Sequence, residues 1–389
     1  MDRIGVFFLL LVFVGIGCQQ SDPSPAPGME KTKLGTFIGT FKPSFFPYID
    51  QEQPQVLRTI LKDNEVSLIA NNPQTREEFL SFVNELDARN IEVVVTIRFQ
   101  HKQVNEEDRV IYSQEELNQL MDDLSVFLGT ANGKVDYIQA LNEPFGIGRY
   151  NSTLDSLAAI HSPEVAEQTV LAWMDTVAHR FRKLIDSENY PVQLLTPSVQ
   201  AKGLEAIGNN QSHLWTYKVT EKIFEIGNRY CDGINFHWYP ESYASMVELM
   251  AVAETSEILH TNPTIYKTCT EWSQAHEVRD ILQQDSQYWQ EALADHCGTS
   301  DSQLESDYLA LINGLPVDHT DTYNMYRLMN DHHYRFATYF AMIQDFYTCG
   351  EVANSWYALT CLYATRFTAN KIPNGRFYEE YQRIREFVD

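Results

Sequence analysis

The sequence predicts an α/β fold: a (β/α)8 barrel that forms a single domain, with an insertion after the seventh strand. Three observations lead to this prediction. Short β-rich runs alternate with longer stretches of helical period, which is the pattern of βα units around a parallel sheet. Most of these runs are continuously apolar, as strands covered on both faces must be. Residues 34–389 also suit one barrel with a few insertions.

Residues 1–18 precede the barrel and are predicted to be an export signal. The apolar run Ile4–Ile16 is too short for a membrane span and is soon followed by polar residues. Because Gly15 and Gly17 come just before Cys18, the segment resembles a bacterial lipoprotein signal, whose cysteine is lipidated. Plain secretion is the alternative. Residues 19–33, rich in Ser, Pro and Gln, are predicted to be a flexible tether.

This resemblance also predicts the location of the protein. Gln19 follows the lipidation site, where some bacteria place an Asp to retain a lipoprotein at the inner membrane. We therefore expect a lipid anchor in the bacterial outer membrane, with a periplasmic or secreted protein as the alternative.

Eight strands are expected, each a short apolar run between helical segments. Their predicted ranges are Leu34–Thr40, Val66–Ala70, Ile91–Arg98, Val135–Leu141, Val192–Pro197, Gly233–His237, Thr264–Thr270 and Ser355–Leu362.

The intervening helices carry their own start signals. Ser113 with Glu116 forms a capping-box pattern, and Ser162-Pro163 is a good N-cap and first-turn pair. A further helix is predicted over 242–257. Residues 274–329 are too long for a plain loop, so we expect an insertion over the active face.

The net charge and the spacing of cysteines and histidines limit which partners the chain is expected to bind. The chain has 29 basic and 53 acidic side chains and a net charge of −24, which disfavours a nucleic-acid partner because nothing would offset phosphate repulsion. No Cys-x-x-Cys pair occurs, and the adjacent His332 and His333 lack a second cluster at ligand spacing, so we predict no metal. We also expect no cofactor, and a monomer.

Two glutamates fall at the ends of predicted strands. Asn142-Glu143-Pro144 follows the fourth strand, and Glu271 follows the seventh. The carboxyl ends of barrel strands meet at the active face. Cleavage of a glycosidic bond by the retaining route needs one protonated carboxyl and one ionised carboxylate, so this pair predicts a glycoside hydrolase.

The same residues resemble clan A of the glycoside hydrolases. In that clan the acid/base follows an Asn at the end of strand four and the nucleophile ends strand seven, which assigns Glu143 and Glu271 to these roles. The clan often has His-x-Tyr on strand six, matched here by His237 and Tyr239. The resemblance implies that Tyr239 reaches the nucleophile, that His237 lines the cleft, and that Asn142 binds the sugar 2-hydroxyl.

Tryptophans near these positions are candidate sugar platforms. The clan commonly places a Trp on strand eight, so Trp356 is expected to form the floor of the reacting subsite. Trp238 and Trp272 adjoin the proposed catalytic residues and either stack on sugar or turn into the barrel wall, because side chains alternate along a strand.

The family within the clan stays open between family 5 and family 39. Family 5 enzymes usually carry an Arg on strand two, whereas the predicted second strand Val66–Ala70 has none and Arg98 ends strand three.

The expected mechanism retains anomeric configuration, which requires carboxyl groups about 5 to 5.5 Å apart. Desolvation and the charge of Glu271 are expected to raise the pKa of Glu143. The predicted substrate is a β-linked polysaccharide or oligosaccharide cleaved internally, although the insertion after strand seven leaves exo action open. A surface glycan-binding lipoprotein without turnover is the alternative function; an aldolase finds no Schiff-base lysine at a strand end.

Overall fold

The computed structural model describes most of the chain after the predicted tether. The described residues are 30–39, 41–99, 102–104, 107–109, 113–143, 162–259, 261–284, 302–343, 360–363 and 372–389. Cys18, Pro144 and Trp356 lie outside them. None of the helices in the described ranges combines the length and apolarity that crossing a bilayer requires.

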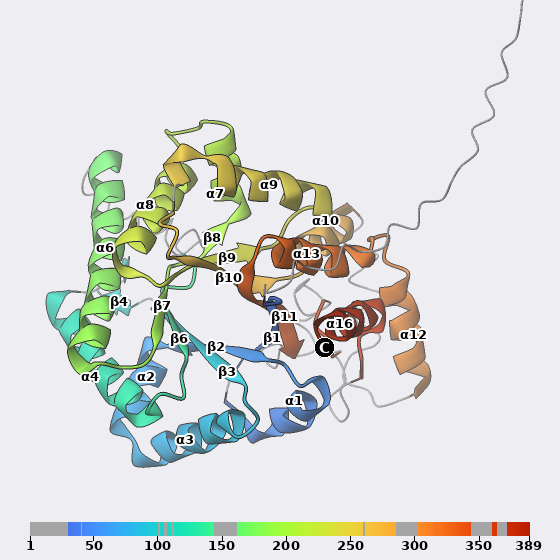
Figure 1. Ribbon diagram of the computed structural model, residues 1–389, viewed down its shortest axis with the longest axis horizontal. Coiled ribbons are helices and arrows are strands. Elements are labelled where there is room, and N and C mark those ends of the chain that lie inside the picture. Colours follow the sequence, from blue (N-terminus) through green and yellow to red (C-terminus); the bar gives the residue numbers. More distant parts are fainter. Residues whose placement is uncertain are drawn as a thin grey trace, which may run out of the picture. The chain divides into compact units, whose positions relative to one another are not determined.

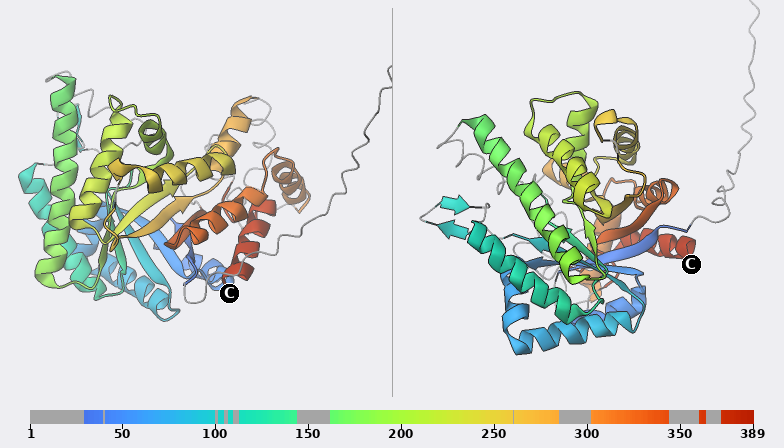
Figure 2. Two further views of the ribbon diagram at one scale, coloured as in Figure 1. Left: turned by 45° about the horizontal axis from the view of Figure 1, so that its top comes forward. Right: turned by 60° about the vertical axis from the view of Figure 1, so that its left-hand side comes forward.

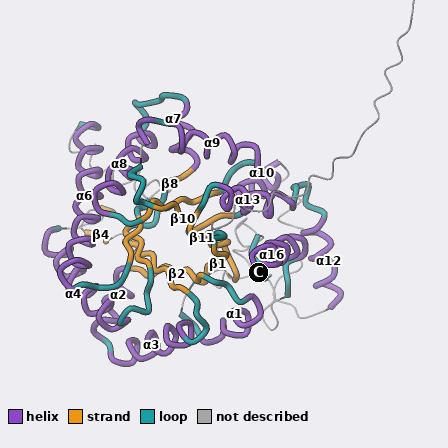
Figure 3. The backbone as a smooth tube through the Cα atoms, viewed as in Figure 1, coloured by secondary structure: helices purple, strands orange, loops and turns teal. Residues whose placement is uncertain are grey.

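Eight parallel strands close into a barrel (Figure 1), which confirms the predicted fold class. The sheet closes because β10 pairs with both β9 and β11, and β11 pairs with β1. Figure 3 shows the strands as a central ring surrounded by helices. In order around the barrel the strands are β1 (Lys33–Ile38), β2 (Val56–Lys62), β3 (Glu92–Arg98), β6 (Tyr137–Ala140), β7 (Gln193–Leu195), β9 (Gly233–Trp238), β10 (Tyr266–Trp272) and β11 (Tyr334–Ile343).

Helices cover the outside of this ring. They are α1 (Phe46–Glu52), α2 (Asp63–Asn71), α3 (Pro73–Asp87), α4 (Gln114–Ala131), α6 (Pro163–Glu188), α7 (Ala201–Gly208), α8 (Trp215–Tyr230), α9 (Tyr243–Thr255), α10 (Ala275–Gln284), α12 (Ser302–Asn313), α13 (Thr320–Asp331) and α16 (Gly375–Val388). The long α6 packs between α4 and α8 (Figure 2). Short elements complete the description: η1 (Pro43–Phe45), η2 (Glu257–Leu259), β8 (Val199–Gln200) beside β9, and a hairpin of β4 (Lys102–Val104) and β5 (Glu107–Arg109).

The predicted helix starts are confirmed at their caps. The hydroxyl of Ser113 accepts from the backbone N–H of Glu116 at 3.2 Å, and the Glu116 carboxylate accepts from the Ser113 N–H at 2.7 Å. Ser242 forms a capping box with Ser245 at the start of α9, and the Ser162 hydroxyl accepts from the Val165 N–H at the start of α6. Each cap satisfies an N–H that has no partner within its helix, which fixes where the helix begins.

Two of the eight predicted strands are wrong. Val66–Ala70 lies inside helix α2, and the second strand is β2, ten residues earlier in the chain. The eighth strand is β11, whereas residues 360–362 of the predicted Ser355–Leu362 form a turn and the rest of that range lies outside the described residues. A short run with four apolar residues in five fits a buried helix face as well as a strand, so pairing with neighbours decides between them.

The segment 274–329 is largely helical where it is described. Helix α13 packs on α9, α16 and β11, as an ordinary barrel helix does. Helices α10 and α12 share a small apolar core with α16, made by Val278, Leu282, Tyr308, Ile312, Leu315, Val317 and Phe377. Helix α12 therefore packs on α16 at the periphery rather than over the strand ends, whereas the start of α10 lies beside the predicted site residues.

The barrel interior has an apolar layer and a polar layer. The apolar layer consists of Val56, Val94, Tyr137, Leu195 and Phe336. Side chains two positions further along a strand point to the same side. On four of these strands that position carries a buried polar residue: Arg58, Thr96, Gln139 and Thr338. The interior thus becomes polar toward the carboxyl ends of the strands, where the predicted glutamates lie.

Candidate active site

Glu143 lies just past the end of β6, where the chain turns sharply. Leu141 has φ of 72°, in the left-handed region that a bulky residue rarely adopts. The side-chain amide of Gln139 donates to the carbonyls of Leu141 and Asn142 at 3.2 and 3.3 Å, which holds this turn. The side chain of Glu143 is 29% exposed, so it is open to a ligand from outside.

Glu271 lies near the end of β10, at an irregularity in the pairing with β9. The register shifts between Cys269 and Glu271. Such bulges re-aim side chains next to active sites. Here Thr270 and Glu271 both contact side chains of the barrel interior although they are consecutive, and Glu271 keeps only 4% of its surface exposed.

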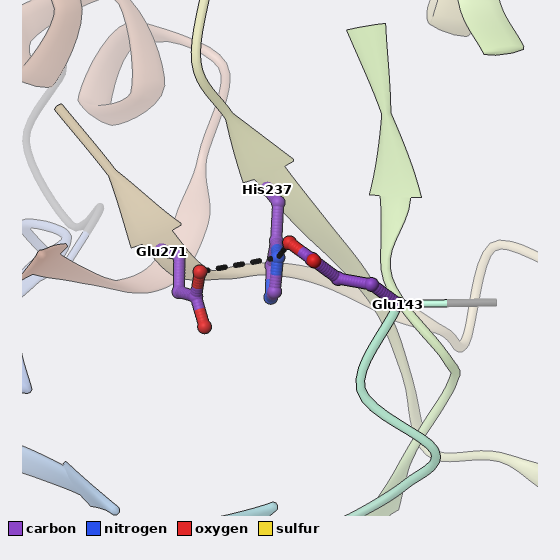
Figure 4. Close-up of side chains that lie close together, drawn as sticks. All are labelled: Glu143, His237 and Glu271. Carbon is purple, nitrogen blue, oxygen red and sulfur yellow. Dashed lines mark hydrogen bonds and ion pairs between the residues drawn. The ribbon is translucent and has the colours of Figure 1, made fainter. Parts of the chain in front are cut away.

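His237 from β9 joins the two carboxylates (Figure 4). Its Nδ1 lies 2.8 Å from Oε1 of Glu143 and 3.4 Å from Oε2 of Glu271. One oxygen of each carboxylate and this nitrogen all lie within 4.8 Å of one another. The structure therefore brings together the predicted Glu143, His237 and Glu271, from strands four, six and seven of the barrel.

Two further side chains donate to Glu271. The hydroxyl of Tyr239 donates to Oε2, as the resemblance implied. The guanidinium of Arg58 donates through Nη1 to Oε1, and through Nη2 to the Asn142 side-chain oxygen at 2.8 Å. Arg58 thus connects the nucleophile candidate with the residue expected to bind the sugar 2-hydroxyl, and leaves the Asn142 amide group to donate elsewhere.

Arg58 was missed because the second strand was placed too late in the chain. The available signal was an arginine between apolar residues in Val56–Lys62, which is unusual for a strand covered on both faces. The expectation that strand two lacks an arginine is corrected: Arg58 lies on β2, is 0% exposed and packs over the ring of Phe37.

The pKa of Glu143 departs from the predicted direction. Burial alone would raise it, but the hydrogen bond and charge of His237, the charge of Arg58 and a hydrogen bond from Gln200 together lower the pKa of Glu143. The predicted rise in the pKa of Glu143 rested on burial and on the charge of Glu271. The donors that lower the pKa come from strands whose side chains meet only in the closed barrel.

The tryptophans beside the catalytic candidates belong to the barrel wall. Trp238 and Trp272 are both 0% exposed. The indole N–H of Trp238 donates to the hydroxyl of Tyr334, and Trp272 packs edge-on against the ring of Tyr339. Neither presents a ring face to a sugar, so their assignment to substrate binding is corrected. Trp356 is outside the described residues and stays a prediction.

Other rings contact the ring of Tyr239. Phe340 of β11 meets the Tyr239 ring edge-on at 6.0 Å between centroids and stacks on Phe37. His276, at the start of α10, lies 5.3 Å from the same ring. Burial and the charge of Arg279 lower the pKa of His276 to about 4, which keeps its imidazole neutral at neutral pH.

The predicted absence of a metal stays a prediction. The three atoms of Glu143, His237 and Glu271 are close enough to surround a small cation. However, both oxygens of Glu271 already accept hydrogen bonds, one of them from the cationic Arg58. Positive charge at this carboxylate is therefore supplied by the protein itself.

Comparison with known proteins gives a fold and no close relative. No protein-family model matches the sequence, and no curated protein matches it either. Solved structures do match, all at low sequence identity.

A GH1 β-glucosidase from Exiguobacterium antarcticum B7 aligns at a TM-score of 0.51 and 10% identity, over 93% of this chain and 98% of the enzyme. An exo-β-1,4-mannosidase from Opitutaceae bacterium strain TAV5 aligns at 0.51 and 8% identity over 93% of this chain, which spans 61% of the mannosidase. A family 39 glycoside hydrolase from Bacteroides cellulosilyticus WH2 aligns at 0.48 and 11% identity over 90% of this chain, which spans 63% of that protein. At these identities the likeness is one of fold.

Proposed function

We propose that this protein is a retaining glycoside hydrolase of clan A type that cleaves a β-linked glycan, with Glu143 as acid/base and Glu271 as nucleophile. The observation that carries the proposal is the pair of carboxylates at the ends of β6 and β10, with one oxygen of each within 4.8 Å of the other. This spacing is close to the roughly 5 to 5.5 Å of retaining enzymes and leaves no room for the water of an inverting mechanism.

In the first step Glu271 attacks the anomeric carbon while Glu143 protonates the leaving oxygen. The hydrogen bonds from Arg58 and Tyr239 fix the direction in which the Glu271 carboxylate attacks. Both weaken as the carboxylate becomes an ester and loses its charge. The amide of Asn142, oriented by Arg58, donates to the 2-hydroxyl as positive charge develops on the ring.

In the second step Glu143 takes a proton from water as the water oxygen bonds to the anomeric carbon, and the bond from that carbon to Glu271 breaks. This step uses the ionised form of Glu143 that its hydrogen bond with His237 favours. The proton that Glu143 gives up in one step therefore returns in the next, and His237 remains in contact with the acid/base throughout.

The proposed protein is exported and anchored by a lipid on Cys18, so its substrate is an extracellular or periplasmic polysaccharide or oligosaccharide. We favour internal cleavage because α12, which follows strand seven, packs on α16 and does not cover the strand ends. The candidate polymers are mannan, glucan, xylan and galactan. In the alternative function, a glycan-binding lipoprotein without turnover, the protein binds the same class of glycan but does not cleave it.

The test measures reducing ends released from these polymers by the chain beginning at Lys31. Glu143→Ala and Glu271→Ala are compared with Glu248→Ala, which removes an exposed carboxylate on α9. We expect one polymer to be cleaved, both active-site changes to abolish its cleavage, and Glu248→Ala to keep it. Proton NMR of the first product should record the β anomer.

Azide separates the two roles. Glu143→Ala with azide should give a β-glycosyl azide, because azide attacks the glycosyl-enzyme without base assistance, whereas Glu271→Ala should give the α-azide. Oligosaccharide binding without release of reducing ends would establish the glycan-binding alternative. Cleavage that survives either glutamate change would reject these catalytic assignments.

A further inference from the structure

The two ring nitrogens of His237 face different groups. Nδ1 lies 2.8 Å from Oε1 of Glu143. Nε2 lies 2.8 Å from the hydroxyl oxygen of Ser198 and 3.0 Å from that of Thr270. A neutral imidazole carries one proton, so the partners of each nitrogen decide where that proton lies.

Gln139 fixes the first part of the hydrogen-bond pattern. Its Nε2 contacts the carbonyls of Leu141 and Asn142, which only accept, so the NH2 group must lie on that side. Its Oε1 therefore faces the hydroxyls of Thr96 and Thr270, at 2.7 and 3.3 Å. An amide oxygen only accepts, so both hydroxyls donate to it.

Arg58 and Asn235 confirm the direction of these two hydroxyls. Nε of Arg58 only donates and lies 3.0 Å from the Thr96 oxygen, which leaves the Thr96 proton for Gln139. Asn235 accepts from the backbone N–H of Thr270 at 3.1 Å, so its NH2 group donates to the Thr270 hydroxyl at 2.8 Å. Thr270 therefore accepts from Asn235 and has its one proton directed at Gln139.

Ser198 is fixed in the same way. Its hydroxyl contacts the carbonyl oxygen of Asn142, and only Ser198 has a proton to place between these two oxygens. The amide of Gln139 donates to the Ser198 oxygen at 2.8 Å. Neither Ser198 nor Thr270 has a proton left for Nε2 of His237.

We infer that Ser198 and Thr270 hold His237 with a proton on Nε2, so that Nδ1 shares a second proton with Glu143 and retains it for catalysis. The role of that shared proton rests on the proposed function. Ser198, Thr270 and Gln139 are positioning residues, because they act through His237 and not on the glycan.

The shared proton has two positions in the His237–Glu143 pair. It lies either on Glu143, hydrogen-bonded to the lone pair of Nδ1, or on Nδ1 of an imidazolium beside the carboxylate. The hydrogen bond and charge of His237, which lower the pKa of Glu143, favour the second of these positions. The proton that the leaving group requires stays within 2.8 Å of the acid/base.

The two hydroxyls make loss of this proton costly. Once it leaves, the lone pair of Nδ1 faces the carboxylate of Glu143. If the Nε2 proton moved to Nδ1 instead, the lone pair left on Nε2 would face the hydroxyl oxygens of Ser198 and Thr270. Among the described residues, the other titratable or charged groups around the pair are Arg58, Glu271, Tyr239 and His276, and the variants below leave all four in place.

The first test locates the protons by NMR of the purified protein labelled with ¹⁵N-histidine. The chain has 11 histidines, and His237→Asn identifies the resonances of His237 by their loss. We expect Nε2 of His237 to carry a proton at every pH at which the protein is folded. A neutral tautomer with its proton on Nδ1 in the unaltered protein would overturn the inference, and no variant needs to fold for that reading.

The second test follows kcat/KM against pH on the cleaved glycan. Ser198→Ala frees Nε2 from one acceptor, so the alkaline limb should move to lower pH by about one unit, since an unmade buried hydrogen bond and one pKa unit are of the same order. Ser198→Thr keeps the hydroxyl and should keep the limb in place. Thr270→Val and Thr270→Ser form a second matched pair.

The two tests separate the inference from the proposed function. The NMR spectrum is recorded without substrate, so the tautomer is established even if no glycan is cleaved. Cleavage with an alkaline limb that does not move in folded Ser198→Ala and Thr270→Val would leave the glycosidase intact and reject the proton-retaining role.

Discussion

The guanidinium of Arg58 and the carboxylate of Glu271 form a buried ion pair between strands two and seven of the barrel. The residues are 213 positions apart in the chain, and they are 0% and 4% exposed. A buried charge that loses its partner costs several kcal/mol, so each residue of such a pair depends on the other. The carboxylate of the nucleophile candidate is therefore held in place by a residue that no local motif around it reveals.

Arg58→Lys should reduce kcat/KM by about 10²-fold or more. A lysine keeps the charge but cannot donate to Glu271, Asn142 and Thr96 at once, as the planar guanidinium does. The measurement is steady-state kinetics on the cleaved glycan. Arg335→Lys alters an exposed arginine at the start of β11 and should keep normal activity. An Arg58→Lys enzyme within twofold of normal would remove Arg58 from the site.

Tyr239→Phe should lower kcat by roughly 10- to 100-fold while the protein stays folded. The change removes the hydroxyl that donates to Glu271 but keeps the ring that packs against His276 and Phe340. Kinetics and circular dichroism are measured together. In Tyr190→Phe the lost hydroxyl bonds Ser125 at the barrel exterior, and this control should behave normally. Equal loss in both variants would point to a general packing effect.

The sequence was sufficient for those parts of the fold that local patterns encode. Caps at Ser113, Ser162 and Ser242 are properties of four consecutive residues, and they are confirmed. Strand identity depends on distant partners. Val66–Ala70 and β2 are both short runs of mainly apolar residues, and pairing of β2 with β1 and β3 is what makes β2 the strand.

The candidate site was predictable where a residue's role follows from its strand. Glu143 and Glu271 were placed because the carboxyl ends of barrel strands meet at one face. Arg58 was not, because its strand was misplaced and its partner lies across the barrel. The sides of the sheet to which Trp238 and Trp272 point depend on the alternation of side chains along each strand and on the bulge in β10. The bulge cannot be read from the sequence, so these sides could not be predicted.

Glu52→Ala should lower the free energy of unfolding by about 3 kcal/mol. This carboxylate at the end of α1 is 0% exposed. It accepts hydrogen bonds from the buried Tyr363, and from the half-buried Tyr378 at 3.0 Å and Gln382 at 2.6 Å, so the change removes the acceptor that these three donors share. Equilibrium unfolding in urea measures the loss.

The control for this prediction lies on the helix that Glu52 anchors. Glu386→Ala removes an exposed carboxylate from α16 and should change stability by less than about 0.5 kcal/mol. Similar losses in the two variants would mean that helix charge, and not the buried contacts of Glu52, stabilises the junction of α1 with α16.

Acid should destabilise the protein through His319, which precedes α13 and is 4% exposed. Neither ring nitrogen has a hydrogen-bond partner among the described residues. Burial, with the charge of Arg376, lowers the pKa of His319 from 6.5 to about 4. Between these pH values the unfolded chain binds a proton that the folded protein does not, so stability is lost as pH falls through this window.

His319→Phe should reduce this loss, because a phenyl ring can pack on Phe377 as the imidazole does and has no proton to bind. Urea unfolding at pH 7 and at pH 4.5 gives the loss for each protein, and the variant should lose less by up to about 3 kcal/mol. His276 has a pKa lowered in the same direction but is present in both proteins, so it cancels in the comparison. His213→Gln alters an exposed histidine and should leave the pH dependence unchanged. If His319→Phe loses as much stability as the unaltered protein, protonation of His319 does not cause the loss at low pH, and protonation of other groups does.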